Sequence, residues 1–189
     1  MSSSRTILGK QQWAEAALRA VARGGIAAVA VEPLARELGV TKGSFYWHFE
    51  NVDALVRETI AHWEELATTR VIEELERIDD PAERLRTLLR VALDRTEHLQ
   101  AEAAIAAAAG SGDARVQPGY ARVSERRLAY VERSMRELGL RGADAKQRAF
   151  ALFALYVGTA SLVGAGVGPI ESERALRAYV RGVSALLLP

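Results

Sequence analysis

The sequence contains no cysteine among its 189 residues and has only three histidines. Without cysteine the chain cannot form disulfide bonds, thiolate nucleophiles or cysteine-ligated metal sites, and this absence is typical of a cytoplasmic protein. The histidines, His48, His62 and His98, lie far apart in the sequence and lack the His-Glu spacing of a zinc enzyme. Neither a glycine-rich phosphate loop nor a nucleophile-elbow motif is present. The sequence therefore predicts no enzyme, no metal site and no cofactor.

Long hydrophobic runs are also missing. None approaches the ~20 residues that a membrane-spanning helix needs, so we expect no membrane association. No apolar stretch follows the first five residues, as it would in a secretory signal. The net charge of +1 gives no sign of a nucleic-acid partner. Residues 1–52 carry six basic and four acidic residues, a small excess with the sign expected of a DNA-binding head.

Apolar residues recur at helical spacing along nearly the whole chain, which predicts an all-α protein of about nine helices. We expect an N-terminal three-helix helix-turn-helix domain over residues 1–50 and a helical ligand-binding and dimerisation domain over residues 51–189. Gly24-Gly25 is expected to end the first helix, and Pro169 to break the most apolar one. The predicted helices cover positions 14–24, 33–39, 42–49, 51–67, 81–99, 101–109, 120–138, 150–167 and 176–187.

The most informative segment is 34–49, with the sequence LARELGVTKGSFYWHF. Gly39 suits a sharp turn that needs a positive φ. Thr41 is a good N-cap, whose hydroxyl is expected to accept a backbone N–H of the following helix. Val40 and Phe45 have the spacing of a hydrophobic staple, which would set the angle at which the chain enters that helix. Two short helices around a tight turn are typical of a helix-turn-helix.

The helix predicted over 42–49 has two distinct faces. Phe45 and Phe49, four residues apart, point inward together. The remaining polar and aromatic residues lie on the other side or at its flank: Ser44, Tyr46, Trp47 and His48. These side chains can contact phosphates or base edges in a major groove, and Lys42 can meet phosphate at the helix N-terminus. The alternative interpretation is that the rings pack against neighbouring helices.

These residues, followed by Asp53-Ala54-Leu55, resemble the signature of the TetR family of bacterial repressors. The resemblance covers the head closely; beyond it, only the number and length of the helices are similar. It implies a three-helix head whose third helix enters the major groove of DNA. It also implies that the fourth helix continues into a regulatory domain.

The resemblance further implies which residues contact DNA. Glu50 and Val52 stand where many members carry lysines that meet phosphate, which leaves Asn51 as the candidate at the start of the fourth helix. Arg5 and Thr6 match the arm ahead of the first helix. The positions that match the recognition helix and the turn before it are Thr41, Lys42, Gly43, Ser44, Tyr46, Trp47 and His48.

A single short recognition helix reads too few bases to be selective, so we expect a homodimer on a palindromic double-stranded DNA operator. Its two heads would lie about 34–36 Å apart. The resemblance implies a dimer surface on the last two helices, where small residues would allow close approach. The alternative is that these helices form the core of a monomer. The predicted interface residues are Ala154, Gly158, Ser161, Ala165, Leu176, Tyr179, Val180, Val183 and Leu187.

The resemblance also implies a pocket for a small-molecule effector, and the composition of the chain favours an apolar or amphipathic molecule. Each candidate could instead be a core residue, or a surface residue in the case of the histidines. Three alternatives remain open: a helical scaffold, a ligand-binding protein that binds no DNA, and a repressor that responds to no ligand. The candidate pocket residues are His62, Trp63, His98, Tyr130, Met135, Phe153 and Tyr156.

Overall fold

The computed structural model describes residues 9–94, 96–168, 170 and 172–188. All regular structure within these residues is helical, which confirms the all-α expectation. Ten α-helices are present, and α4 and α5 are joined without a break by the π-helical turn Glu65–Thr69, so that about nine separate rods result. In this part of the chain, no helix combines the length and the apolar character needed to cross a bilayer.

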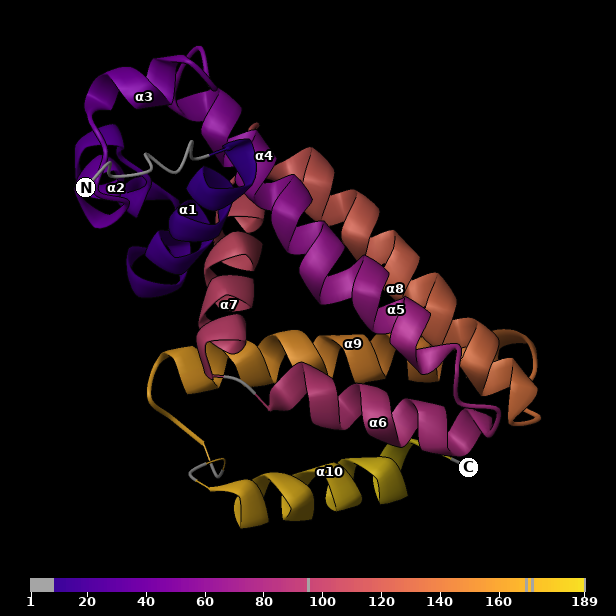
Figure 1. The fold of residues 1–189 in the computed structure, drawn as a ribbon. Helices are drawn as coiled ribbons and strands as arrows, with labels where there is room; N and C mark the ends of the chain where they lie inside the picture. The colour runs from indigo at the N-terminus through magenta and orange to yellow at the C-terminus, as the bar shows by residue number, and fades with distance from the viewer. Residues whose placement is uncertain (1–8, 95, 169, 171, 189) are drawn as a thin grey trace.

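Three short helices, α1 (Lys10–Gly24), α2 (Val31–Glu37) and α3 (Lys42–Tyr46), form a head at one end of the molecule (Figure 1). Gly25 closes α1 with a φ of +70°. Helix α2 begins at Val31, two residues before the predicted start at Pro33. Pro33 is tolerated there, because the N–H groups of the first helical turn have no intrahelical partner and proline at such a position loses no hydrogen bond.

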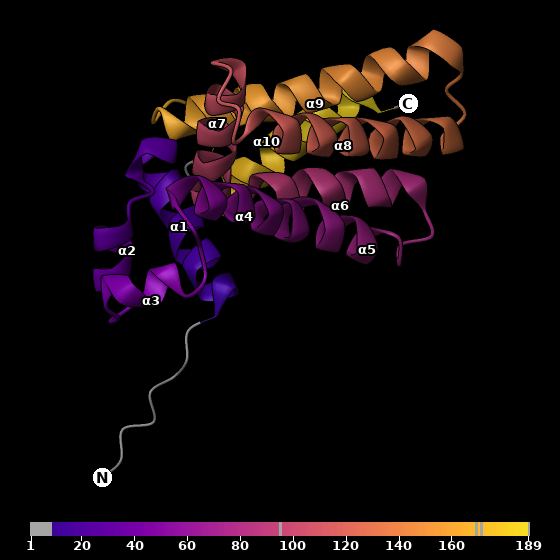
Figure 2. The same ribbon diagram turned by 90° about the horizontal axis from the view of Figure 1, so that it is seen from above.

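Helix α4 (Val52–Glu64), the π turn and α5 (Arg70–Leu75) form one long rod that leaves the head. Helix α8 (Gln117–Glu137) contacts α4 and runs beside this rod in Figure 1, and Figure 2 shows the same helices from above, with α6 drawn between α8 and α5. The two helices approach closely at Gly119, where a Cβ atom would lie 2.5 Å from Cγ2 of Ile60. The rod is therefore held against α8 at a distance that only glycine permits.

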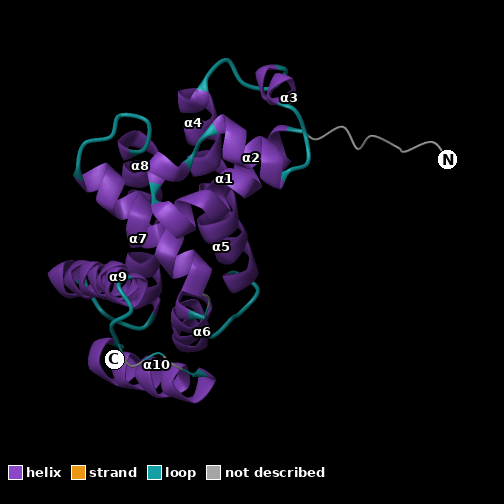
Figure 3. Cartoon of the chain, turned by 90° about the vertical axis from the view of Figure 1, so that its left-hand side faces the viewer, coloured by secondary structure: helices purple, strands orange, loops and turns teal. Residues whose placement is uncertain are grey.

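The rest of the body is built on α9 (Gly142–Gly164). Helix α7 (Thr96–Gly110) packs against both α1 and α9 and so connects the head to the body. Helices α6 (Pro81–Leu93) and α10 (Glu173–Leu187) contact α9 and close the end of the molecule away from the head (Figures 1 and 3).

Several predicted helix boundaries are wrong, among them the start of α9, which begins at Gly142 rather than at Phe150. The helix that begins at Pro81 ends at Leu93, and Leu99 belongs to α7, which has 15 residues and starts before the alanine tract. Apolar periodicity continues across this break, so the sequence pattern alone does not reveal it. Helix α9 ends at Gly164. The break predicted at Pro169 lies outside the described residues.

The largest hydrophobic core joins the head to the body. Trp13 of α1 and Phe45 of α3 are fully buried in it, together with Ile60 of α4 and Ile105 of α7. A second core cluster lies among α5, α6, α8, α9 and α10. Since α4 and α7 share the core of the head, a displacement of either helix must disturb the packing around α3.

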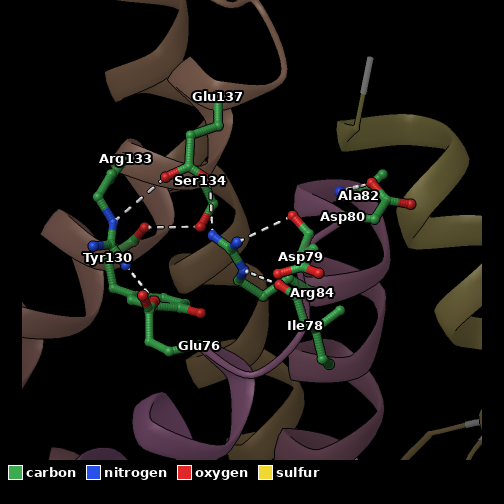
Figure 4. A network of polar contacts seen from close by, with 10 residues as sticks. All are labelled: Glu76, Ile78, Asp79, Asp80, Ala82, Arg84, Tyr130, Arg133, Ser134 and Glu137. Carbon is green, nitrogen blue, oxygen red and sulfur yellow. Dashed lines mark hydrogen bonds and ion pairs between the residues drawn. The ribbon is translucent and has the colours of Figure 1, made fainter.

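The far end of the body is fastened by a buried arginine (Figure 4). Nη1 of Arg84 in α6 donates to Oε2 of Glu137 in α8 at 2.7 Å. Its Nε and Nη2 donate to the backbone carbonyls of Ile78 and Asp79 at 3.0 and 3.3 Å. Arg133 adds an ion pair with Glu76. These contacts hold the loop between α5 and α6 on α8.

Candidate nucleic-acid interface and ligand cavity

Helix α3 rests on an aromatic cluster. The ring of Phe45 meets Trp13 of α1 edge-on, with 5.4 Å between the ring centroids, and stacks on Phe49 at 5.5 Å. Gly39, with a φ of +67°, makes the turn between α2 and α3. Leu34–Phe49 is thus a pair of short helices around a tight turn, as the sequence predicts.

The predicted orientation of α3 is confirmed. Phe45 is 0% and Phe49 4% exposed, whereas Tyr46 is 64% and Trp47 87% exposed. Thr41, Lys42 and Gly43 are exposed as well, and Ser44 and His48 are half-buried. An exposed tryptophan costs free energy in water, since its large apolar ring stays hydrated. The head thus presents two aromatic rings to whatever lies in front of α3.

Two local details differ from the prediction. The α-helix ends at Tyr46 rather than Phe49, although Phe49 N–H still donates to the Phe45 carbonyl at 3.0 Å. Thr41 is the N-cap, but its hydroxyl makes no capping bond; its backbone carbonyl accepts the Ser44 N–H at 3.0 Å. Thr41 as a residue is exposed.

The polar candidates around α3 have partners within the chain. Lys42 forms an exposed ion pair with Glu32, and the hydrogen bond and charge of Lys42 lower the pKa of Glu32. Such an exposed pair stabilises little, so phosphate can replace the carboxylate at small cost. Asn51 caps α4, its Oδ1 accepting the Ala54 N–H at 2.9 Å. Arg5 and Thr6 lie outside the described residues.

A cavity of about 640 Å³ lies where α4, the π turn and α8 face α6, α7 and α9. This volume is within the range of ligand pockets, about 300–1,000 Å³. Six of the seven candidate pocket residues line it; Met135 does not, because it is fully buried in the second core cluster. The six lining residues are His62, Trp63, His98, Tyr130, Phe153 and Tyr156.

The inner wall of the cavity carries a buried ion pair that sequence analysis missed. Nη1 of Arg127 in α8 donates to both carboxylate oxygens of Glu102 in α7, at 2.9 and 3.0 Å. The hydroxyl of Tyr156 in α9 donates to Glu102 Oε2 at 3.1 Å. The one available signal was Glu102 itself, a lone carboxylate in an otherwise apolar alanine tract.

Burial dominates the protonation of the tyrosines in this wall. It raises the pKa of Tyr130 to about 12, and together with the charge of Glu102 it raises the pKa of Tyr156. Burial by itself would lower the pKa of Arg127, but the attraction of Glu102 outweighs it and raises that pKa. The wall therefore holds neutral phenols and a permanently charged, paired guanidinium. Nε2 of His62 is buried without a hydrogen-bond partner among the described residues.

The predicted dimer residues fall into two groups. Ala154, Gly158, Ser161 and Ala165 are all exposed along α9, where Phe150 and Leu162 are 63% and 54% exposed. A Cβ at Gly158 would meet no atom within 4 Å. This side of α9 is therefore an open, mostly apolar stripe.

The α10 residues do not belong to that open surface. Leu176 and Val183 are buried, and the half-buried Tyr179, Val180 and Leu187 pack with them on the cores of their own chain. These five side chains remain a prediction for the dimer interface, and within this subunit the apolar face of α10 that carries them packs on other helices of the same chain. The exposed side of α10 carries instead Ala178, Gly182, Ala185 and Leu186.

Within the described residues, no group of three or more histidine, aspartate or glutamate side chains could hold a metal ion. The charged side chains that line the cavity are the buried pair Arg127 and Glu102, the exposed Asp94 and Glu97, and Glu15 and Arg19 of α1. The arrangement offers a binding cavity and an exposed helix.

Residues 14–59 match the family model described as bacterial regulatory proteins, tetR family. No curated protein sequence matches the chain. Several solved structures share its fold over nearly the whole length. A transcriptional regulator from Rhodococcus sp. Rha1 has a TM-score of 0.81 and 20% identity, with 95% of this chain and 96% of that chain covered.

A TetR transcriptional regulator from Legionella pneumophila has a TM-score of 0.80 and 15% identity, and covers 99% and 100% of the two chains. A protein from Saccharomonospora viridis assigned as a transcriptional regulator, solved in complex with choline, has a TM-score of 0.78 and 22% identity, and covers 94% of each chain. At these identities the solved structures establish a common fold. The match to the tetR family model over residues 14–59 is the additional evidence from sequence.

Proposed function

Given that this chain is a TetR-family regulator by the sequence of its head and by its fold, we propose that it is a homodimeric repressor. It binds a palindromic operator and leaves it when a small molecule enters the cavity. In this proposal residues 1–50 are the DNA-binding domain and residues 51–189 the ligand-binding and dimerisation domain. The protein acts in the cytoplasm, where bacterial DNA is accessible to it.

One observation carries the proposal: Trp47 and Tyr46 are exposed on α3 while the phenylalanines of the same helix are buried. An aromatic pair on the outer face of a short helix suits insertion into a major groove, where rings contact thymine methyl groups and hydroxyls contact phosphates. The exposed Thr41, Lys42 and Gly43 at the start of α3 border the same surface. Ser44 and His48 complete the proposed contact.

The DNA-binding test is selection of bound duplexes from a random pool, followed by affinity measurement on the selected operator. We expect a sequence with two-fold symmetry, and a loss of about 1–3 kcal/mol in operator binding for Trp47→Ala. Arg77→Ala is the matched control, because Arg77 is exposed at the end of α5 away from the head. An unchanged operator affinity in Trp47→Ala and Tyr46→Ala would refute the role of α3.

Dimerisation is proposed through the exposed face of α9 and the exposed side of α10. Small residues at Ala154 and Gly158 on α9, and at Ala178 and Gly182 on α10, would let two helix pairs approach closely. Gly158→Arg is expected to yield a monomer by sedimentation and to weaken operator binding. Gly110→Arg is the control, since Gly110 is likewise exposed with open space around it. A dimeric Gly158→Arg variant would disprove this interface.

The effector is proposed to act through the α4–α5 rod, which lines the cavity and leads into the head. The residues that line the cavity are mostly aliphatic and aromatic, so an apolar or amphipathic molecule fits. A structure of similar fold is occupied by choline, which supports a small-molecule ligand in this chain. If the effector moves the α4–α5 rods, the distance between the two heads of the dimer should change. Measuring this distance with and without effector tests the mechanism, and an unchanged distance excludes it.

A further inference from the structure

Arg127 links the cavity to the rod that leads into the head. Its Nε donates to Oγ1 of Thr68 at 2.9 Å and its Nη2 to the carbonyl of Ala67 at 3.2 Å, both within the π turn Glu65–Thr69. Its Nη1 is bound by Glu102 of α7. One guanidinium thus holds the π turn on one side and a carboxylate on the other.

The same guanidinium occupies an aromatic box. Its carbon lies 4.9 Å from the ring centroid of Trp63 and 5.7 Å from that of Tyr156, both within cation–π range. Glu102, which is 1% exposed, supplies the negative charge. A carboxylate and two ring faces form the kind of site that binds organic cations, and here the cation is a side chain of the protein itself.

The charges of the wall favour a cationic ligand over an anionic one. A buried carboxylate that loses its positive partner destabilises the fold, so Glu102 is best satisfied with a positive charge beside it. A ligand that displaces Arg127 must therefore bring a positive charge of its own. Both arginines that line the cavity are engaged by carboxylates, Arg127 by Glu102 and Arg19 by Glu37. An anion would have to break one of these pairs.

We propose that the cavity binds an apolar organic cation that replaces the Arg127 guanidinium on Glu102 and thereby releases the π turn between α4 and α5. The apolar body of the ligand lies among the aliphatic residues of the cavity, and its charged group takes the carboxylate and the two rings. Thr68 and the Ala67 carbonyl lose their donor, so the rod is free to shift. This inference rests on the proposed function, in which the cavity controls DNA binding.

The test uses three probes that share one phenylbutyl body: 4-phenylbutyl-trimethylammonium, 4-phenylbutan-1-ol and 5-phenylpentanoate. Binding to the purified full chain is measured by titration calorimetry. We expect the ammonium to bind about tenfold or more tightly than the alcohol, and the carboxylate most weakly. Only the ammonium should release the selected operator DNA.

Variants distinguish an effect of the buried Glu102 carboxylate from an effect of the other carboxylates at the cavity. Arg127→Met removes the internal competitor and is expected to raise the affinity for the ammonium, whereas the loss of a purely structural residue would lower it. Glu102→Gln/Arg127→Met carries neither charge of the pair, should fold, and is expected to lose most of the preference for the ammonium, keeping only the part that the rings of Trp63 and Tyr156 supply. Glu97→Gln, an exposed carboxylate at the edge of the cavity, is the control and should keep the preference for the ammonium.

Operator binding is measured on the same samples, so that failure of the ligand class and failure of the proposed function are distinguishable. Three outcomes with operator binding intact would overturn the ligand class and leave DNA binding standing. In the first the three probes bind alike, in the second the carboxylate binds best, and in the third none binds at millimolar concentration. If the double variant keeps the full preference for the ammonium, Glu102 is not the site. If no operator is bound at all, the proposed function itself fails.

Discussion

Gly119→Ala probes the close approach of α8 to the α4–α5 rod. The added Cβ would lie 2.5 Å from Cγ2 of Ile60, well inside van der Waals contact, and Ile60 is itself 2% exposed. Overpacking of this kind costs about 1–3 kcal/mol. The gain in helix propensity offsets at most about 1 kcal/mol, because Gly119 lies in the first turn of α8. We therefore expect a net destabilisation of about 1–2 kcal/mol.

The assay is urea unfolding followed by circular dichroism, arranged as a double-mutant cycle with Ile60→Ala. Ile60→Ala alone should cost about 2–5 kcal/mol through the cavity it leaves. The double variant should be less destabilised than the sum of the two, by about 1–2 kcal/mol, since the new methyl group fills part of that cavity. Gly110→Ala, with open space around it, is the control and should stay within about 1 kcal/mol of the parent.

Strict additivity in this cycle, with Gly119→Ala no less stable than the parent, would refute the reasoning. It would mean that α4 and α8 separate without cost, and that the rod is not held at the distance the structure gives. The outcome matters for regulation, because the rod that contains Ile60 also lines the cavity and leads into the head.

Three further predictions address the head, the far end of the body and the loop before α8. Glu50→Lys adds a positive charge next to the start of α4 and should strengthen operator binding. Each new phosphate contact steepens the slope of log K against log salt concentration by about 0.9, which fluorescence anisotropy measures. An unaltered slope would contradict a phosphate contact at this position. Arg84→Met leaves two backbone carbonyls and a carboxylate without their donor and should cost about 2–4 kcal/mol in urea unfolding, whereas a loss below about 0.5 kcal/mol would show that Arg84 does not fasten the loop. The hydrogen bond from Arg115 lowers the pKa of Asp113 from 3.8 to about 2, so the stability it contributes is present above about pH 4 and lost as the pH falls toward 2. Asp113→Asn should therefore unfold more easily than the parent at pH 7 and equally at pH 2, and a difference independent of pH would exclude the carboxylate as its cause.

The head could be predicted from the sequence because its determinants are local. Phe45 and Phe49 share a face through the pitch of a single helix, and Gly39 allows the positive φ of the turn that precedes it. Once that face is buried against Trp13, Tyr46 and Trp47 have to point outward. All of these relations lie within a segment of about fifteen residues and Trp13.

The cavity and the open faces of α9 and α10 could not be predicted in the same way. Amphipathic periodicity shows that α10 has an apolar face, but not that α6, α8 and α9 of the same chain cover it. The buried pair of Glu102 and Arg127 joins helices 25 positions apart in the sequence, and no spacing rule connects them. Glu102 was visible as a lone carboxylate in an apolar tract, yet the sequence contained no sign of its partner.

The sequence by itself determined the helical class, the helix-turn-helix and the face that the recognition helix exposes, since each depends on side chains within one or two turns of one another. Only the tertiary structure decided which residues line the cavity, which charge is buried beside it and which side of the last two helices remains open. Those features depend on how whole helices pack, and the packing is selected by the summed burial of many side chains rather than by any local pattern.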